Sequence, residues 1–126
     1  MADPLMSNRR TILMVEDSPS LSRAYETQLA PLGHEVIMVA DGASALAMLE
    51  TRQIDCILLD LQLPDMDGMA VLDVARVLKA PPAVVVITSN ASINMAIRAI
   101  RSGAIDYLVR PEPRDLLWTV GTHLQN

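Results

Sequence analysis

The chain has 126 residues, with 10 basic and 15 acidic side chains and a net charge of −5. This length favours a single domain, and the acidic balance excludes the basic surface that nucleic-acid binding needs, so we expect no direct contact with DNA or RNA. Hydrophobic residues make up 51% of the chain and aromatic residues only 2%, so the core must consist mainly of Leu, Ile, Val, Ala and Met.

The first ten residues lack a continuous apolar segment, and we expect residues 1–10 to form a loose lead-in to a domain over residues 11–126. No stretch approaches the roughly 18 uninterrupted apolar residues of a membrane helix. We therefore expect a cytoplasmic protein that makes no membrane contact. The single cysteine, Cys56, lies in an apolar run; a small buried side chain is the simpler interpretation, and a reactive thiol is the alternative.

Five apolar runs predict β-strands, and each is followed by a segment with helical features. The predicted strands are residues 11–16, 35–39, 55–60, 83–88 and 106–110, and the predicted helices are residues 18–33, 43–52, 68–79, 92–102 and 113–124. Ser18 and Pro19 form a typical helix start, and Gly33 a typical stop. The helix over 92–102 carries Ile93, Ile97 and other apolar residues along one face.

Strands that alternate with helices indicate an α/β fold with a parallel sheet covered on both faces. Right-handed crossovers restrict the possible topologies. For five strands, the commonest arrangement is the doubly wound, flavodoxin-like (βα)5 fold with strand order 2-1-3-4-5. In such a sheet, ligands bind at the carboxyl edge, near the point where the first and third strands are neighbours.

Three carboxylates lie where two of the apolar runs end. Glu16 and Asp17 follow the first run, and Asp60 follows the third. Buried, unpaired charges are costly, and like charges close together raise each other's pKa. Because the two strands are expected to be parallel neighbours, this acidic cluster predicts a bound divalent cation.

The available ligands favour Mg²⁺. Asp17 and Asp60 would each supply one oxygen, Glu16 would act directly or through water, and the backbone carbonyl of Gln62 would complete the protein's share. The set is too sparse for a Ca²⁺ cage and offers no thiolate or imidazole for Zn²⁺.

Polar groups also end the fourth and fifth strands. Thr88 and Ser89 offer hydroxyls, and Arg110 offers a guanidinium suited to phosphate. Carboxylates, a cation, a hydroxyl and a guanidinium around one point suit phosphoryl transfer, with Asp60 as the nucleophile. Taken singly, each group has a simpler reading: Asp17 and Asp60 as helix N-caps, Thr88 as an ordinary strand residue and Arg110 as a solvated strand end.

From about Arg10 to Leu124, the chain resembles the receiver domain of two-component response regulators. The resemblance rests on the segments 12–17 (ILMVED), 57–60 (ILLD), 63–68 (LPDMDG), 86–88 (VIT) and 103–111 (GAIDYLVRP). Residues 61–68 together with Ser92 and Ile93 are most similar to receivers of sigma-54-dependent transcription activators.

The resemblance implies a role for each matching position. Asp60 would accept a phosphoryl group from a histidine kinase or phosphotransfer protein, while Glu16, Asp17, Asp60 and the Gln62 carbonyl hold Mg²⁺. Thr88 would move to hydrogen-bond the phosphoryl group, and Tyr107 would turn inward behind it. The face formed by residues 92–102, 106–110 and 113–124 would then change its affinity for a partner or a second copy. Such a domain is a switch rather than a turnover enzyme, and we expect any output domain to lie outside this sequence.

Two positions depart from the family pattern. Lys is usual where Arg110 stands, and Ala or Gly is common where Ser89 stands. Arg is bulkier and planar, so the alternative function is a degenerate receiver that binds partners independently of phosphorylation. Other phosphate-binding enzymes fit less well: a haloacid-dehalogenase-like phosphatase needs Asp where Gln62 stands, and a flavodoxin needs a Gly- and hydroxyl-rich loop where residues 16–19 stand.

Overall fold

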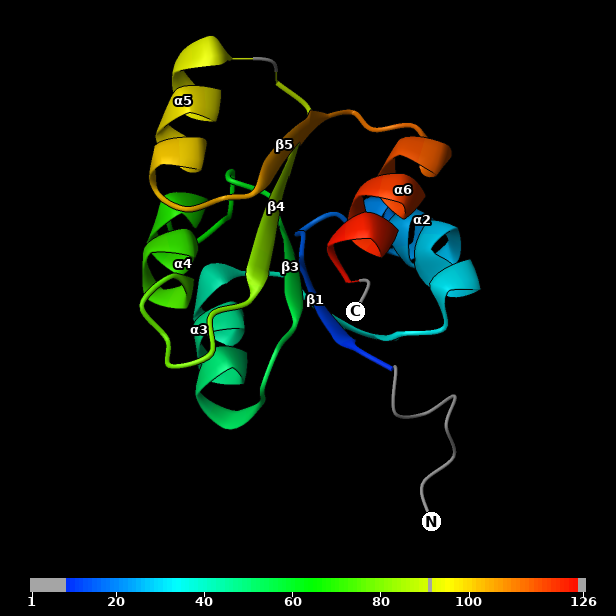
Figure 1. Cartoon of the computed structure of the whole chain (residues 1–126). Helices are drawn as coiled ribbons and strands as arrows, with labels where there is room; N and C mark the ends of the chain where they lie inside the picture. Colours follow the sequence, from blue (N-terminus) through cyan, green and yellow to red (C-terminus); the bar gives the residue numbers. More distant parts are fainter. Residues whose placement is uncertain (1–8, 91, 125–126) are drawn as a thin grey trace.

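The computed structural model describes residues 9–90 and 92–124, in which five parallel strands form one sheet in the order β2-β1-β3-β4-β5 (Figure 1). This is the predicted fold and strand order. The strands are β1 (Thr11–Val15), β2 (Glu35–Val39), β3 (Cys56–Leu59), β4 (Ala83–Thr88) and β5 (Asp106–Val109). The helices are α2 (Pro19–Leu29), α3 (Gly42–Thr51), α4 (Gly68–Ala75), α5 (Ile93–Arg101) and α6 (Pro113–His123), with a short 3₁₀ turn, η1 (Ala30–Leu32), after α2. Most of the predicted lead-in, residues 1–8, lies outside the described residues.

Helices cover both faces of the sheet: α3, α4 and α5 lie on one side, and α2 and α6 on the other (Figure 1). Successive strand residues point to opposite faces, so each strand contributes to both cores. In β1, Leu13 and Val15 belong to the core beneath α3, α4 and α5. Ile12 and Met14 belong to the core beneath α2 and α6.

The register of the central strands brings their ends to one edge of the sheet. Val15 pairs with Val39 of β2 and with Leu59 of β3. The ladder continues one residue further on each side, since the Glu16 N–H donates to the Val39 carbonyl at 3.1 Å and the Asp60 N–H donates to the Val15 carbonyl at 3.0 Å. Glu16 and Asp60 therefore leave the sheet at the same level.

Helix α4 ends at Ala75 and is therefore shorter than the predicted helix, which extends to residue 79. Beyond it, the Val77 N–H bonds the Val74 carbonyl and the Leu78 N–H bonds the Ala75 carbonyl, both at 3.3 Å. These three-residue steps tighten the chain into turns. The two prolines at 81 and 82 mark only the latest point at which the helix has to stop.

The isoleucine face of α5 points away from the core. Ile93 is 79% exposed, and Ile97 and Ile100 are 43% and 48% exposed. The fully buried residue of this helix is Ala99, and Met95 packs beside it against the core. A stripe of apolar residues commonly marks the buried face of a helix. On α5, this stripe lies at the surface.

Within the described residues, none of the helices combines the length and apolar character needed to cross a membrane. Cys56 is fully buried in β3, and burial raises the pKa of its thiol to about 12. This confirms the structural interpretation of the cysteine, because a thiol that stays protonated is a poor nucleophile.

Candidate functional site

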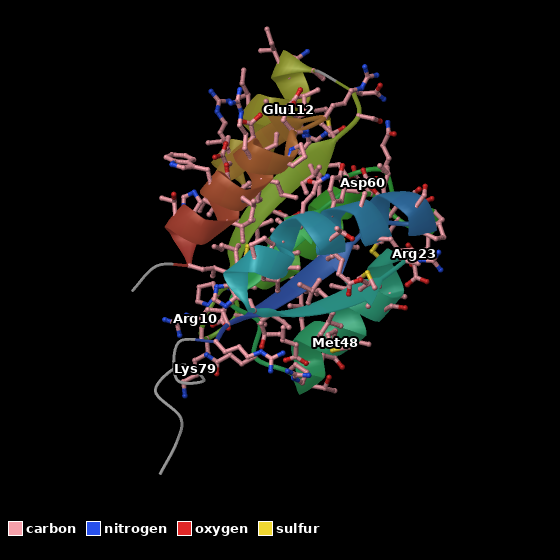
Figure 2. The ribbon with its side chains drawn as sticks, turned by 90° about the vertical axis from the view of Figure 1, so that its right-hand side faces the viewer. Arg10, Arg23, Met48, Asp60, Lys79 and Glu112 are labelled. Atoms are coloured by element: carbon pink, nitrogen blue, oxygen red, sulfur yellow. The ribbon has the colours of Figure 1, made fainter. Side chains whose placement is uncertain are left out.

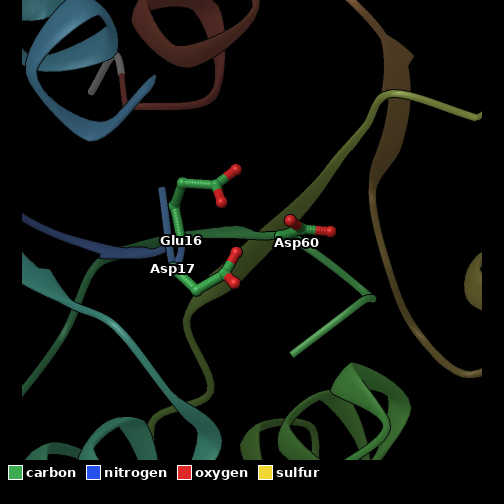
Figure 3. A group of neighbouring side chains, drawn as sticks. All are labelled: Glu16, Asp17 and Asp60. Carbon is green, nitrogen blue, oxygen red and sulfur yellow. The ribbon is translucent and has the colours of Figure 1, made fainter. Parts of the chain in front are cut away.

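Glu16, Asp17 and Asp60 come together at the carboxyl edge of the sheet, as the sequence predicts. One carboxylate oxygen from each lies within 4.8 Å of the others. Figure 3 shows the three side chains gathered around the ends of the strands, with the Asp17 carboxylate directed toward Asp60. In Figure 2, Asp60 lies at the opposite end of the molecule from Arg10 and Lys79. The two strand ends thus create a compact acidic cluster.

The cluster is electrostatically unfavourable without a cation. Burial raises the pKa of Glu16 to about 7, and the nearby charges of Asp60 and Asp17 add to the rise, against the effect of the Ser18 N–H that donates to its Oε2 at 3.0 Å. Burial also raises the pKa of Asp60, with a further contribution from Asp17, while the Gln62 N–H that donates to its Oδ1 at 2.9 Å acts in the opposite direction. A positive ion between these groups would stabilise all three charges.

The donor set fits a hard divalent cation. All three groups are carboxylates, and no His or Cys belongs to this cluster in the described part of the chain. Mg²⁺ prefers oxygen ligands and usually keeps several water molecules in its coordination shell. Gln62 lies beside Asp60 through its N–H, and the role of its carbonyl oxygen as a further ligand stays a prediction.

The residues at the ends of β4 and β5 face the same space. A cavity of about 390 Å³ is lined by Glu16 and Asp60 and also by Thr88, Ser89 and Arg110. The α2 side of this cavity carries Leu21, Ala24, Tyr25 and Gln28. Burial and the negative charges of Glu16 and Asp60 raise the pKa of Tyr25, so this side chain is a neutral phenol at physiological pH.

Thr88 is buried and linked to the segment that follows β4. Its hydroxyl accepts the Asn90 N–H at 3.1 Å and donates to the Asn90 carbonyl at 3.4 Å. The Tyr107 hydroxyl donates to the same carbonyl at 3.4 Å. Tyr107 is half-buried and packs against the core on the α5 side of the sheet. Thr88 and Tyr107 are therefore connected through one backbone group.

Arg110 adopts an unusual backbone conformation for a residue other than glycine, with φ at +44°. Its N–H donates to the Thr88 carbonyl at 2.9 Å, which extends the pairing of β4 and β5. Left-handed backbone geometry costs energy and commonly marks functional positions. Arg110 is exposed and lines the cavity together with Glu16 and Asp60.

The simpler reading of the two aspartates as helix caps is wrong. Ser18, rather than Asp17, is the N-cap of α2, and its hydroxyl accepts the Leu21 N–H. Asp67, rather than Asp60, is the N-cap of α4. Neither acid has a capping role that would explain its position.

Sequence reasoning did not single out Asn90 or Tyr25. Asn90 stands two residues after Thr88, and a backbone carbonyl that serves two side-chain hydroxyls leaves no residue-type signal. Tyr25 belongs to a helical apolar repeat in the sequence, which predicts its burial but not its place in the cavity.

Comparison with known proteins identifies close likenesses over most of the chain. The profile of the family described as "Response regulator receiver domain" matches residues 12–120. Regulatory protein LuxO of Vibrio vulnificus is 39% identical over 104 residues, which cover 82% of this chain and 23% of that protein. DNA-binding response regulator MtrA of Mycolicibacterium smegmatis is 35% identical over 120 residues, covering 93% of this chain and 51% of that protein.

Solved structures of receiver domains are also similar to this chain. The signal receiver domain of a LuxO repressor protein from Vibrio parahaemolyticus superposes with a TM-score of 0.87 at 34% identity, covering 92% of this chain and 90% of that one. A CheY-like receiver domain from Methanospirillum hungatei gives a TM-score of 0.86 at 30% identity, with 92% and 94% coverage.

Proposed function

The chain belongs to the response regulator receiver domain family, and from this premise we propose that Asp60 is its phosphoacceptor. The observation that carries the proposal is the acidic cluster, in which Asp60 lies within reach of the carboxylates of Glu16 and Asp17. Asp60 is half-buried at the end of a central strand and borders the cavity, so a phosphoryl donor has access to it.

In the proposed reaction, one carboxylate oxygen of Asp60 attacks the phosphorus of a phosphohistidine. The new O–P bond forms as the P–N bond breaks, and the imidazole nitrogen keeps the electron pair of that bond. A proton from water makes the departing group a neutral imidazole. The Gln62 N–H already occupies Oδ1 of Asp60, which leaves Oδ2 for the attack. Positioning and charge neutralisation provide most of the catalysis in such transfers, and the product is an acyl phosphate on this chain, not a released product of repeated turnover.

Glu16, Asp17 and Asp60 are the residues that would hold Mg²⁺. When bound, Mg²⁺ supplies positive charge that offsets the negative charge of the phosphoryl oxygens. Arg110 and Thr88 line the same cavity. Arg110 is proposed to add a second positive group there, and Thr88 to donate its hydroxyl to the phosphoryl group.

The response is proposed to pass from Thr88 to the surface formed by α5, β5 and α6, named here the α5–β5–α6 face. When Thr88 turns to the phosphoryl group, it leaves the Asn90 carbonyl, which the Tyr107 hydroxyl also contacts. Exposed apolar side chains lie on each element of this face, including Ile93 on α5, Val109 on β5 and Trp118 on α6. We propose that a second copy or an output domain packs there.

The partners follow from the family. A histidine kinase or phosphotransfer protein is the proposed donor. The chain spans 23% of the length of the LuxO proteins and about half that of MtrA, so an output domain that regulates transcription is also a proposal. The identity to LuxO supports the resemblance to receivers of sigma-54-dependent activators. A cytoplasmic location stays a prediction from the sequence.

The alternative is a receiver that signals without phosphorylation. Arg110 favours it, because its guanidinium is exposed and has no hydrogen bond or ion pair with another described residue. Backbone NMR with the phosphoryl mimic beryllofluoride and Mg²⁺ separates the two functions. Resonance shifts around Thr88 and Tyr107 support the phosphoacceptor, whereas an unchanged spectrum supports the alternative.

Labelling with acetyl phosphate tests the proposed function. Intact-mass spectrometry is expected to show one added phosphoryl group that requires Mg²⁺ and is absent in Asp60→Ala. Labelling that persists in this variant would exclude Asp60 as the acceptor.

A further inference from the structure

A single carboxylate ties the loop between β3 and α4 to a neighbouring helix. The Asp65 side chain accepts the N–H of Gly42 through Oδ1 at 2.8 Å and the N–H of Ala43 through Oδ2 at 2.9 Å. These amides belong to the first two residues of α3, where the helix itself offers no acceptor. Hydrogen bonds from backbone amides to a carboxylate at a helix N-terminus are strong because they are charge-assisted. They also hold the pKa of Asp65 below its usual range.

The next residue strengthens this attachment. The Met66 side chain lies against Gly42, so closely that a Cβ added at Gly42 would overlap it. Gly42 is buried, and α3 and α4 lie side by side on the same face of the sheet (Figure 1). Asp65 and Met66 thus fix the tip of the loop on the start of α3.

The base of the same loop is built on the phosphoacceptor. The Gln62 N–H donates to Asp60 Oδ1 at 2.9 Å, Gln62 forms an antiparallel bridge with Asp67, and the Gly68 N–H donates to the Leu61 carbonyl at 2.9 Å. The loop is therefore closed on itself, with Gln62 at its base and Asp65 and Met66 at its tip.

We infer that Asp65 is a positioning residue for the phosphoacceptor site. It fixes the tip of the loop on α3 and thereby holds the Gln62 amide in place against the Asp60 carboxylate. Asp65 touches neither the acidic cluster nor the reacting atoms, so its action is indirect and runs through Gln62. This inference rests on the proposed function, because the orientation of Asp60 matters for that chemistry.

The test compares Asp65→Ala with a matched control, Asp41→Ala. Asp41 also caps α3, since its Oδ1 accepts the Ser44 N–H at 2.7 Å, but Asp41 is not part of the loop. Both variants lose an acceptor at the N-terminus of α3, so both are expected to lower the urea midpoint of unfolding. Only Asp65→Ala is expected to disturb Gln62.

The first measurement uses the metal-free protein. In Asp65→Ala, the Gln62 amide proton resonance is expected to shift upfield and its hydrogen exchange to become about tenfold faster, as for a weakened hydrogen bond. In Asp41→Ala, both quantities are expected to match the wild type. Asp65→Asn retains one acceptor oxygen and is expected to lie between Asp65→Ala and the wild type.

The second measurement is a Mg²⁺ titration followed by NMR. The half-saturating concentration is expected to rise about tenfold in Asp65→Ala, at the lower end of the effect of residues that orient ligands. Asp41→Ala is expected to titrate like the wild type.

The inference is overturned when the Gln62 resonance and the Mg²⁺ titration of Asp65→Ala coincide with those of Asp41→Ala, because Asp65 would then only cap a helix. If Asp65→Ala does not fold, the comparison rests on Asp65→Asn. A disturbed Gln62 amide in a protein whose Asp60 is never phosphorylated would uphold the positioning role and reject the proposed function.

Discussion

The hydroxyls of Thr88 and Tyr107 share one acceptor, the backbone carbonyl of Asn90, and each donates to it at 3.4 Å. Both hydrogen bonds are long, and a hydrogen bond with this donor–acceptor distance is weak. A change at Thr88 therefore alters the surroundings of Tyr107 at little cost. This relationship gives the proposed switch a physical connection between the cavity and the α5–β5–α6 face.

Replacing Thr88 with Val is expected to break this connection. The substitution keeps the shape of the buried side chain but leaves the Asn90 N–H without its acceptor, so the free energy of unfolding should fall by about 1 kcal/mol. The beryllofluoride-induced NMR shift at Tyr107 should be strongly reduced. Thr119→Val is the control, because Thr119 is also buried but lies on α6 outside the cavity. Equal shifts at Tyr107 in the wild type and Thr88→Val would contradict the connection.

The raised pKa of Glu16 predicts how stability and metal binding depend on pH. Its ordinary value is 4.5 and its value in the fold is about 7, so the folded, metal-free protein holds this proton more tightly than the unfolded chain does. The contribution of Glu16 to stability is therefore complete below pH 4.5 and is lost as the pH rises from 4.5 through 7. Mg²⁺ must displace the same proton, so its affinity should increase over this range.

Urea unfolding in EDTA at about pH 5 and about pH 8 measures the first effect, and Mg²⁺ titration at the two pH values measures the second. Glu16→Gln has no proton to release at this position and should lose this part of the pH dependence. Mg²⁺ affinity that is independent of pH between these values would show that Glu16 is not protonated in the metal-free protein.

Arg110 offers a graded test of whether a positive side chain in the cavity assists phosphorylation. If its guanidinium contacts the phosphoryl group, Arg110→Ala should slow phosphorylation of Asp60 by acetyl phosphate by about tenfold or more. Arg110→Lys should give a rate different from both, because an ammonium is a compact charge rather than a planar fork. Reactions quenched at successive times and analysed by mass spectrometry give the phosphorylation rates of the wild type and the two variants. Identical rates would mean that Arg110 takes no part in the transfer.

Substitution of an exposed isoleucine of α5 tests whether the α5–β5–α6 face binds a second copy. Ile93 is 79% exposed, so Ile93→Ser should change the free energy of unfolding by no more than about 0.5 kcal/mol. The same variant should weaken any self-association that beryllofluoride induces, as measured by light scattering. Val77→Ser is the control, because Val77 is 73% exposed but lies outside the α5–β5–α6 face. An equal effect of both substitutions would argue against this face.

The position of the acidic cluster could be predicted from the sequence because it depends on two simple rules. The apolar runs before Glu16 and Asp60 mark buried strands, and parallel neighbours end at the same edge of a sheet. The strand order then places the three acids together, and the structure confirms it.

Other features depend on contacts between distant segments and leave no local signal. The end of α4 at Ala75 follows from a change of hydrogen-bond pattern that no residue type announces. The stripe that begins at Ile93 has the period of a buried helix face, but α5 packs on the core through Ala99 and Met95, so the stripe faces outward. Asp65 looks like any acid in a loop, because its two amide partners lie 22 and 23 residues away in the chain.

Chemical mapping of the phosphorylated residue tests the central claim most directly. After reaction with acetyl phosphate and Mg²⁺, reduction with borohydride converts an aspartyl phosphate to homoserine, and peptide mass spectrometry locates it. We predict homoserine at position 60 alone, and none when Mg²⁺ is removed. Homoserine at position 17 or elsewhere, or its absence from the fully reacted protein, would contradict the assignment of Asp60 as the phosphoacceptor.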